Sequence, residues 1–315
     1  MTDTSPTHTA RGYAAALGAA ALLSTTAVFI RYLTLTYHLP AMVLAFWRDV
    51  FTVLALGVVL AIVRPALLRV ERRHLGFLIA YGVMLAVFNA MWTLSVAYNG
   101  AAVATVIADC SAAFTVLLGW ILLKEGLNWG KTIAVVLSIT GCVLVADALD
   151  PAVWAINPIG ILTGIMSALT YAGYGLMGRA ASQRGLNPWT SLLYTFTFAT
   201  VILLGINLLP GEVVPGGAIE VSDLLWLGAA WAGWGVLFLL GAGPTVGGFG
   251  LYNVSLSLLP SSIANVIVAT EPAFTAVTAY AFLGERLSLV QLLGAALVIG
   301  GVIFLRVYQG RVARG

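Results

Sequence analysis

The sequence predicts an all-α integral membrane protein with ten transmembrane helices, arranged as two inverted five-helix repeats. Three observations predict this fold: the composition, ten apolar segments of spanning length, and a similarity between the two halves of the chain. Of the 315 residues, 61% are hydrophobic and 9% are charged, whereas soluble domains average about 45–50% apolar and about 25% charged residues. These values exclude a water-soluble globule, an intrinsically disordered chain and a disulfide framework.

Ten segments are apolar over about the 20 residues that a helix needs to cross a bilayer. Short connections separate them, and several contain helix-breaking residues such as Pro40, Pro151 and Pro188. The expected spans cover residues 12–30, 41–63, 75–98, 102–123, 130–146, 158–178, 189–209, 233–258, 262–283 and 287–306.

Two of these segments allow more than one interpretation. The first has about 19 apolar residues after Arg11, longer than the apolar region of a usual signal peptide, so we expect a spanning helix. The stretch 221–258 would measure about 57 Å as one helix, which is too long for a bilayer core. We expect an interfacial piece at 223–232 and a span that breaks around residues 241–244, although an eleventh span is an alternative.

The distribution of basic residues predicts the orientation. With the N-terminus in the cytoplasm, 12 Lys and Arg residues fall on the inner side, while only Arg31 and Arg286 fall outside and Arg48 lies within the second span. Inner loops of membrane proteins carry such an excess of positive charge. We therefore expect a multi-pass protein of the cell (inner) membrane with both termini cytoplasmic, and this orientation disfavours eleven spans.

The two halves of the chain resemble each other. A shift of 160 residues aligns 102–145 with 262–305 without a gap, and 12 positions are identical, among them the Ala-Phe-Thr segment and the Glu-x-Leu segment that follows it. We expect one repeat in residues 1–150 and the other in 151–315. Because five spans is an odd number, the repeats must be inverted, an arrangement typical of secondary transporters with a site near the middle of the membrane.

Particular motifs extend this interpretation. They are Ala45-Phe46-Trp47-Arg48, Thr270-Glu271-Pro272-Ala273-Phe274, Phe282-Leu283-Gly284-Glu285-Arg286-Leu287 and the glycine-rich last span. On these motifs the chain resembles the drug/metabolite transporter superfamily, EamA type, over essentially its whole length. The resemblance implies a gradient-linked carrier of small metabolites, often an exporter of amino acids or related compounds. The first half departs from the pattern, because Asp109 is displaced by two positions relative to Glu271 and the proline is missing.

Two acidic residues are the first candidates for the site. Asp109 and Glu271 are each expected roughly 12–15 Å into a span. A carboxylate at that depth costs at least ~2.5 kcal/mol, so it must be protonated, paired or facing a water-filled cavity. Proton coupling or binding of a substrate amine is one interpretation, and a fixed hydrogen bond or ion pair between helices is the other.

Further candidates are polar or aromatic residues within the spans. Arg48 is suited to bind a substrate carboxylate, or it pairs with an acid on a neighbouring helix. Asn89 and Trp92 share a helix face, and Tyr252 is the rough counterpart of Trp92; contacts between helices are the alternative for all three. The glycines around Gly241 either expose backbone groups to a substrate or allow close packing. The remaining candidates are Ser111, Asn265, Thr270 and Tyr174.

These observations predict a secondary transporter that works by alternating access, with the proton as candidate coupling ion. A nucleotide-sugar or phosphorylated-metabolite exchanger is the main alternative, but it should need several basic residues inside the spans, where only Arg48 is found. A non-transporting receptor or scaffold is a second alternative. The spans contain no cluster typical of an enzyme, a metal site or a nucleic-acid interface. Expected partners are a small-molecule substrate, the lipid bilayer and protons, without a cofactor, in a monomer or homodimer.

Overall fold

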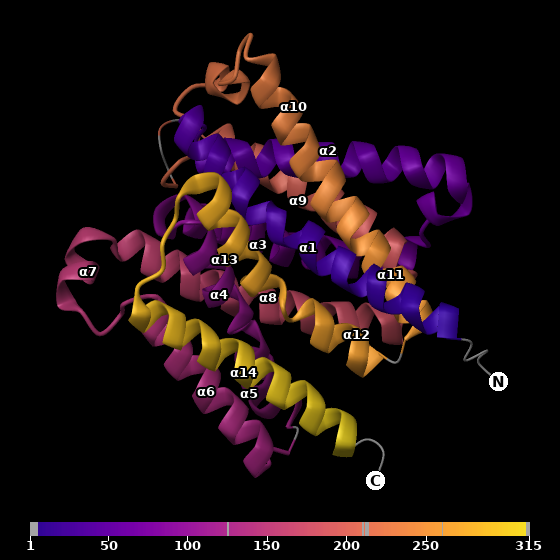
Figure 1. Ribbon diagram of the computed structural model, residues 1–315. Helices are drawn as coiled ribbons and strands as arrows, with labels where there is room; N and C mark the ends of the chain where they lie inside the picture. The colour runs from indigo at the N-terminus through magenta and orange to yellow at the C-terminus, as the bar shows by residue number, and fades with distance from the viewer. Residues whose placement is uncertain (1–5, 125, 210, 212–213, 260, 313–315) are drawn as a thin grey trace.

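The computed structural model describes residues 6–124, 126–209, 211, 214–259 and 261–312. These residues form one helical bundle (Figure 1). Ten helical segments within them match the predicted spans. They are α1 (Pro6–Thr36), α2 (Ala41–Val63), α3 (Leu75–Asn99), α4 and α5 (Ala101–Asp109 and Ser111–Leu123), α6 (Trp129–Val145), α8 (Pro158–Gln183), α9 (Pro188–Asn207), α10 and α11 (Trp231–Leu240 and Phe249–Leu258), α12 and α13 (Ser261–Val268 and Glu271–Leu283), and α14 (Leu289–Val312).

Asparagine residues define several helix starts. The side chain of Asn128 accepts a hydrogen bond from the backbone N–H of Lys131 at the start of α6. Asn157 and Asn187 cap α8 and α9 in the same way, and each is followed by a proline at the first helical position. Proline is tolerated there because its missing N–H would have no partner within the helix. Outside the spans, α7 (Pro151–Ile156) is a short helix in the connection before α8.

The fourth and ninth spans lie where the sequence predicts them, and each is interrupted by a short break between two helices. The first break lies at Cys110, whose N–H donates to the carbonyl of Ile107 at 3.1 Å, and whose own carbonyl accepts from Ala113 at 2.9 Å. The second break lies at Thr270, with the same bonds to Ile267 at 3.0 Å and to Ala273 at 3.0 Å. The two breaks are 160 residues apart, the spacing of the repeat.

A local cause of the break is visible in one repeat only. Pro272 lies in the first turn of α13, and a proline kinks or breaks a regular α-helix because it lacks an N–H and its ring clashes with the preceding turn. The first repeat has Ala112 at the corresponding position. The same geometry therefore forms there without a proline.

The eighth span continues through the glycine-rich segment, where we expected a break. Residues Gly241–Gly248 form a π-helical stretch between α10 and α11. A Cβ atom on Gly241 would lie 3.0 Å from the carbonyl oxygen of Arg48, and one on Gly248 would lie 2.8 Å from Leu23. These glycines allow close packing against α2 and α1, so the packing interpretation is correct for them.

The segment before α10 is not an additional span. Val221–Leu225 forms a single 3₁₀ helix, and a series of turns leads from it to the start of α10 at Trp231. Five helical residues are far too few to cross a bilayer. The alternative of eleven spans is therefore wrong.

Helices α6 and α14 pack closely, side by side (Figure 1). A Cβ atom on Gly141 would lie 2.5 Å from the carbonyl oxygen of Gly294, and one on Gly301 would lie 3.1 Å from that of Ala134. Adding 160 to 141 and 134 gives 301 and 294, so the two contacts are equivalent. The sequence repeat is thus a structural repeat, and small residues let the two backbones approach closely.

Glu285 links distant parts of the chain at one end of the bundle. Its carboxylate accepts hydrogen bonds from the N–H groups of Ala101 at 3.0 Å and Ala102 at 3.1 Å, and lies 3.4 Å from Nε of Arg31. Gly100, in the left-handed region at φ 87°, leaves room for this carboxylate, because a Cβ there would lie 2.9 Å from Oε1. The start of α4 is therefore capped by a residue from the connection between α13 and α14.

The α6–α14 contact gives a direct test of the packing. Gly141→Ala should lower the free energy of unfolding by about 1–3 kcal/mol, because the added methyl group overlaps a backbone carbonyl that cannot move alone. Gly300→Ala is the matched control, since its Cβ would meet nothing within 4 Å. That control should be neutral or stabilising. Unfolding of the purified protein in detergent measures both, and equal stability of the two variants would contradict the described contact.

Candidate functional site

A cavity of about 430 Å³ lies between the two repeats, and nearly all the spanning segments contribute to its wall. It brings together eight of the ten candidates selected from the sequence: Arg48, Asn89, Trp92, Asp109, Ser111, Tyr174, Tyr252 and Glu271. Thr270 is not part of the wall, and its hydroxyl donates to the carbonyl of Ile267 at 2.6 Å. The side chain of Asn265 lies outside the described part of the chain. The roles of all ten residues stay predictions.

The two acidic candidates flank the two helix breaks. Asp109 is the last residue of α4, and Glu271 is the first residue of α13. The displacement of two positions in the sequence thus places the acids on opposite sides of equivalent breaks. A negative charge is favoured at a helix N-terminus and disfavoured at a C-terminus. The carboxylate of Glu271 therefore has the more favourable position of the two.

One wall of the cavity is aromatic. The rings of Phe88 and Tyr171 are stacked, with centroids 4.7 Å apart and an angle of 16° between their planes. Trp92 continues the array beyond Phe88, and Tyr174 continues it beyond Tyr171. Phe88 was not among the selected candidates, whereas the spacing of three residues between Tyr171 and Tyr174 indicates from the sequence that these two share a face. This wall provides a flat apolar surface next to two carboxylates.

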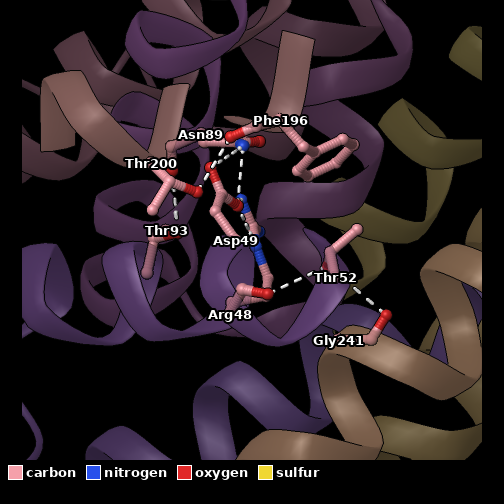
Figure 2. Close-up of polar contacts among 8 residues, drawn as sticks. All are labelled: Arg48, Asp49, Thr52, Asn89, Thr93, Phe196, Thr200 and Gly241. Atoms are coloured by element: carbon pink, nitrogen blue, oxygen red, sulfur yellow. Dashed lines mark hydrogen bonds and ion pairs between the residues drawn. The ribbon is translucent and has the colours of Figure 1, made fainter. Parts of the chain in front are cut away.

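A compact polar cluster of Arg48, Asp49 and Asn89 links α2 to α3 (Figure 2). Nε and Nη2 of Arg48 each lie 3.3 Å from Oδ1 of Asp49. The amide nitrogen of Asn89 donates to both carboxylate oxygens of Asp49, at 2.9 Å and 2.8 Å. Asp49 is completely buried and Arg48 is 4% exposed.

This cluster corrects one of the two interpretations of Arg48, the pairing with an acid on a neighbouring helix. Its acidic partner is the next residue of its own helix and not an acid on a neighbouring helix. The interaction with another helix is made instead by Asn89 of α3, through Asp49. The Arg-Asp dipeptide is the only signal in the sequence that could have identified Asp49.

Replacement of Asn89 tests the energetic importance of the cluster. Asn89→Leu keeps a similar volume but leaves the buried Asp49 without two hydrogen bonds, so the free energy of unfolding should fall by about 2–4 kcal/mol. Asn253→Leu is the matched control, because the Asn253 side chain donates only to a carbonyl of its own helix, that of Phe249. Thermal unfolding of both variants in detergent is the measurement. Similar losses in the two variants would show that the bonds to Asp49 contribute nothing specific.

Comparisons with known proteins agree with this architecture. The model of the EamA-like transporter family matches residues 10–146 and 158–307. "Uncharacterized transporter sll1319" of Synechocystis is 28% identical over 71% of this chain and 64% of its own length, slightly under two thirds of that protein. "Threonine/homoserine exporter RhtA" of Escherichia coli is 29% identical over 78% of this chain and 77% of its own. Among the solved structures that share the fold is a crystal structure with a TM-score of 0.59 and 16% identity, over 97% of this chain and 98% of its own. The chain belongs to the EamA-like transporter family and is an integral membrane protein.

Proposed function

We propose that this transporter exports amino acids or related amphipathic solutes across the cell membrane by alternating access. The observation that carries the proposal is the cavity between the repeats, which has Asp109 and Glu271 at the two helix breaks and an aromatic wall beside them. Carboxylates bind a protonated amine, and aromatic rings bind the apolar part of a solute. The similarity to a protein named as a threonine/homoserine exporter supports the same substrate class.

The two breaks supply the mechanical part of the proposal. The repeats, residues 1–150 and 151–315, rock against each other around the cavity, and the helix pairs bend at Cys110 and Thr270. Glu271 or Asp109 takes up a proton in one facing state and releases it in the other. Two acids that face one cavity repel each other when both are charged, so binding of a proton or of a substrate amine stabilises the site.

The proposal also covers the location, orientation and oligomeric state of the protein. We place it in the inner membrane with both termini in the cytoplasm, as a monomer or homodimer that needs no cofactor and catalyses no chemical conversion. Its partners are the small solute, protons and the bilayer. A carrier of phosphorylated solutes fits the cavity less well, because Arg48 is the one positively charged residue among the described residues of its wall.

Counterflow into proteoliposomes tests the proposal. Vesicles loaded with a pool of the twenty L-amino acids should accumulate at least one labelled member of that pool, with a rate that differs between two luminal pH values. Glu271→Gln should lower accumulation to the level of protein-free vesicles, because an amide cannot take up the proton. Glu71→Gln is the matched control, since Glu71 is exposed and lies outside the spans.

Three results would contradict this account. Transport with unchanged pH dependence in the double variant Glu271→Gln/Asp109→Asn would exclude both carboxylates from coupling. Accumulation of nucleotide sugars or sugar phosphates in place of amino acids would favour an exchanger of phosphorylated solutes. Absence of flux for every solute in folded protein would favour a receptor or scaffold.

A further inference from the structure

Arg48 lines the cavity, and the hydrogen bonds described for it do not use all its donors. A guanidinium group carries five N–H donors. The bonds described for Arg48 use only Nε and Nη2, and both go to the same oxygen of Asp49. Within the described part of the chain, Nη1 donates to no residue. Only 5% of the surface of the Arg48 side chain is exposed, and the residue lines the cavity.

The hydrogen bonds from Arg48 to Asp49 are longer than those from Asn89 to Asp49. Both distances from Arg48 are 3.3 Å, whereas charge-assisted N–H···O⁻ bonds are usually about 2.7–2.9 Å long. The bonds from Asn89 are 2.9 Å and 2.8 Å. Asp49 is not part of the cavity wall. Asp49 therefore balances the charge of Arg48 from outside the cavity wall, and Asn89 holds the carboxylate of Asp49 in place.

We propose that Arg48 binds the carboxylate of the transported solute, and that Asp49 and Asn89 are positioning residues that hold the guanidinium toward the cavity. The planar guanidinium can bind a carboxylate through two parallel N–H groups. Arg48, Asp109 and Glu271 line the same cavity, so a solute with both an amine and a carboxylate finds a partner for each charge. The inference rests on the proposed function and defines its solute as a zwitterion, not a simple amine.

Matched solutes separate this role from a structural one. The probes are L-threonine, L-leucine and L-phenylalanine, each as the free acid and as its amide, and binding is measured with the purified full-length protein in detergent. The wild type should bind at least one free acid more tightly than its amide by about 10- to 100-fold, the range expected for hydrogen bonds to a charged group. In Arg48→Gln this preference should disappear.

A second variant keeps the test valid if Arg48→Gln does not fold. The double variant Arg48→Gln/Asp49→Asn removes both charges together, so no unpaired charge is left buried. It should still lose the preference for the acid. Arg64→Gln is the matched control, because Arg64 is exposed at the end of α2 and should keep the full preference.

The outcomes separate the failure of this inference from the failure of the proposed function. Retention of the acid preference by the folded double variant would show that Arg48 serves only to pair with Asp49. Equal binding of acids and amides by the wild type would also overturn the inference, while leaving an amine transporter in place. If the wild type binds neither acids nor amides and also shows no amino-acid counterflow, the proposed substrate class itself is wrong.

Discussion

The whole structure depends on one constraint: inside a bilayer, a backbone N–H or C=O group has no water to bind. Spanning segments are therefore helical, and irregular backbone is tolerated only where protein or a water-filled cavity surrounds it. The two breaks, at Cys110 and Thr270, satisfy this constraint because their neighbours Asp109 and Glu271 line the cavity. The tight packing of α6 against α14 occurs elsewhere, between continuous helices. The two breaks thus lie at the cavity that we propose binds the solute.

The helices of the two repeats are arranged symmetrically, but the residues that line the cavity are not. The equivalent breaks place one acid at the end of α4 and the other at the start of α13. Pro40 precedes α2, and Pro188 begins α9, the corresponding span of the other repeat, 148 residues later. The same spacing relates Arg48 to Phe196, and both of these residues line the cavity. One repeat thus contributes a guanidinium group where the other contributes an aromatic ring. Alternating access needs only that the frame be symmetrical, so the lining residues are free to differ and to recognise an asymmetric solute.

Most of the fold could be predicted from the sequence, because length and apolarity determine which segments can cross a bilayer. The break at Thr270 has a local signal in Pro272, but the break at Cys110 has none and depends on packing within the repeat. The π-helical path through Pro244 was equally unpredictable, because it depends on close contact of glycines with α1 and α2. For the candidate site, Glu271 and Arg48 could be selected from the sequence because each is a charged residue within an apolar span. The position of Asp49 behind Arg48 could not be predicted, because adjacent helical residues do not normally face each other.

The central claim is that the cavity between the repeats is open to each side of the membrane in turn, and cysteine labelling tests it most directly. Ala269 lies at the second break and lines the cavity, whereas the native Cys110 and Cys142 are buried. Ala269→Cys in oriented vesicles should react with a membrane-impermeant maleimide added to either side, and the wild type should not react. Transported solute should slow the reaction. Reaction from one side only, or from neither, would contradict alternating access through this cavity.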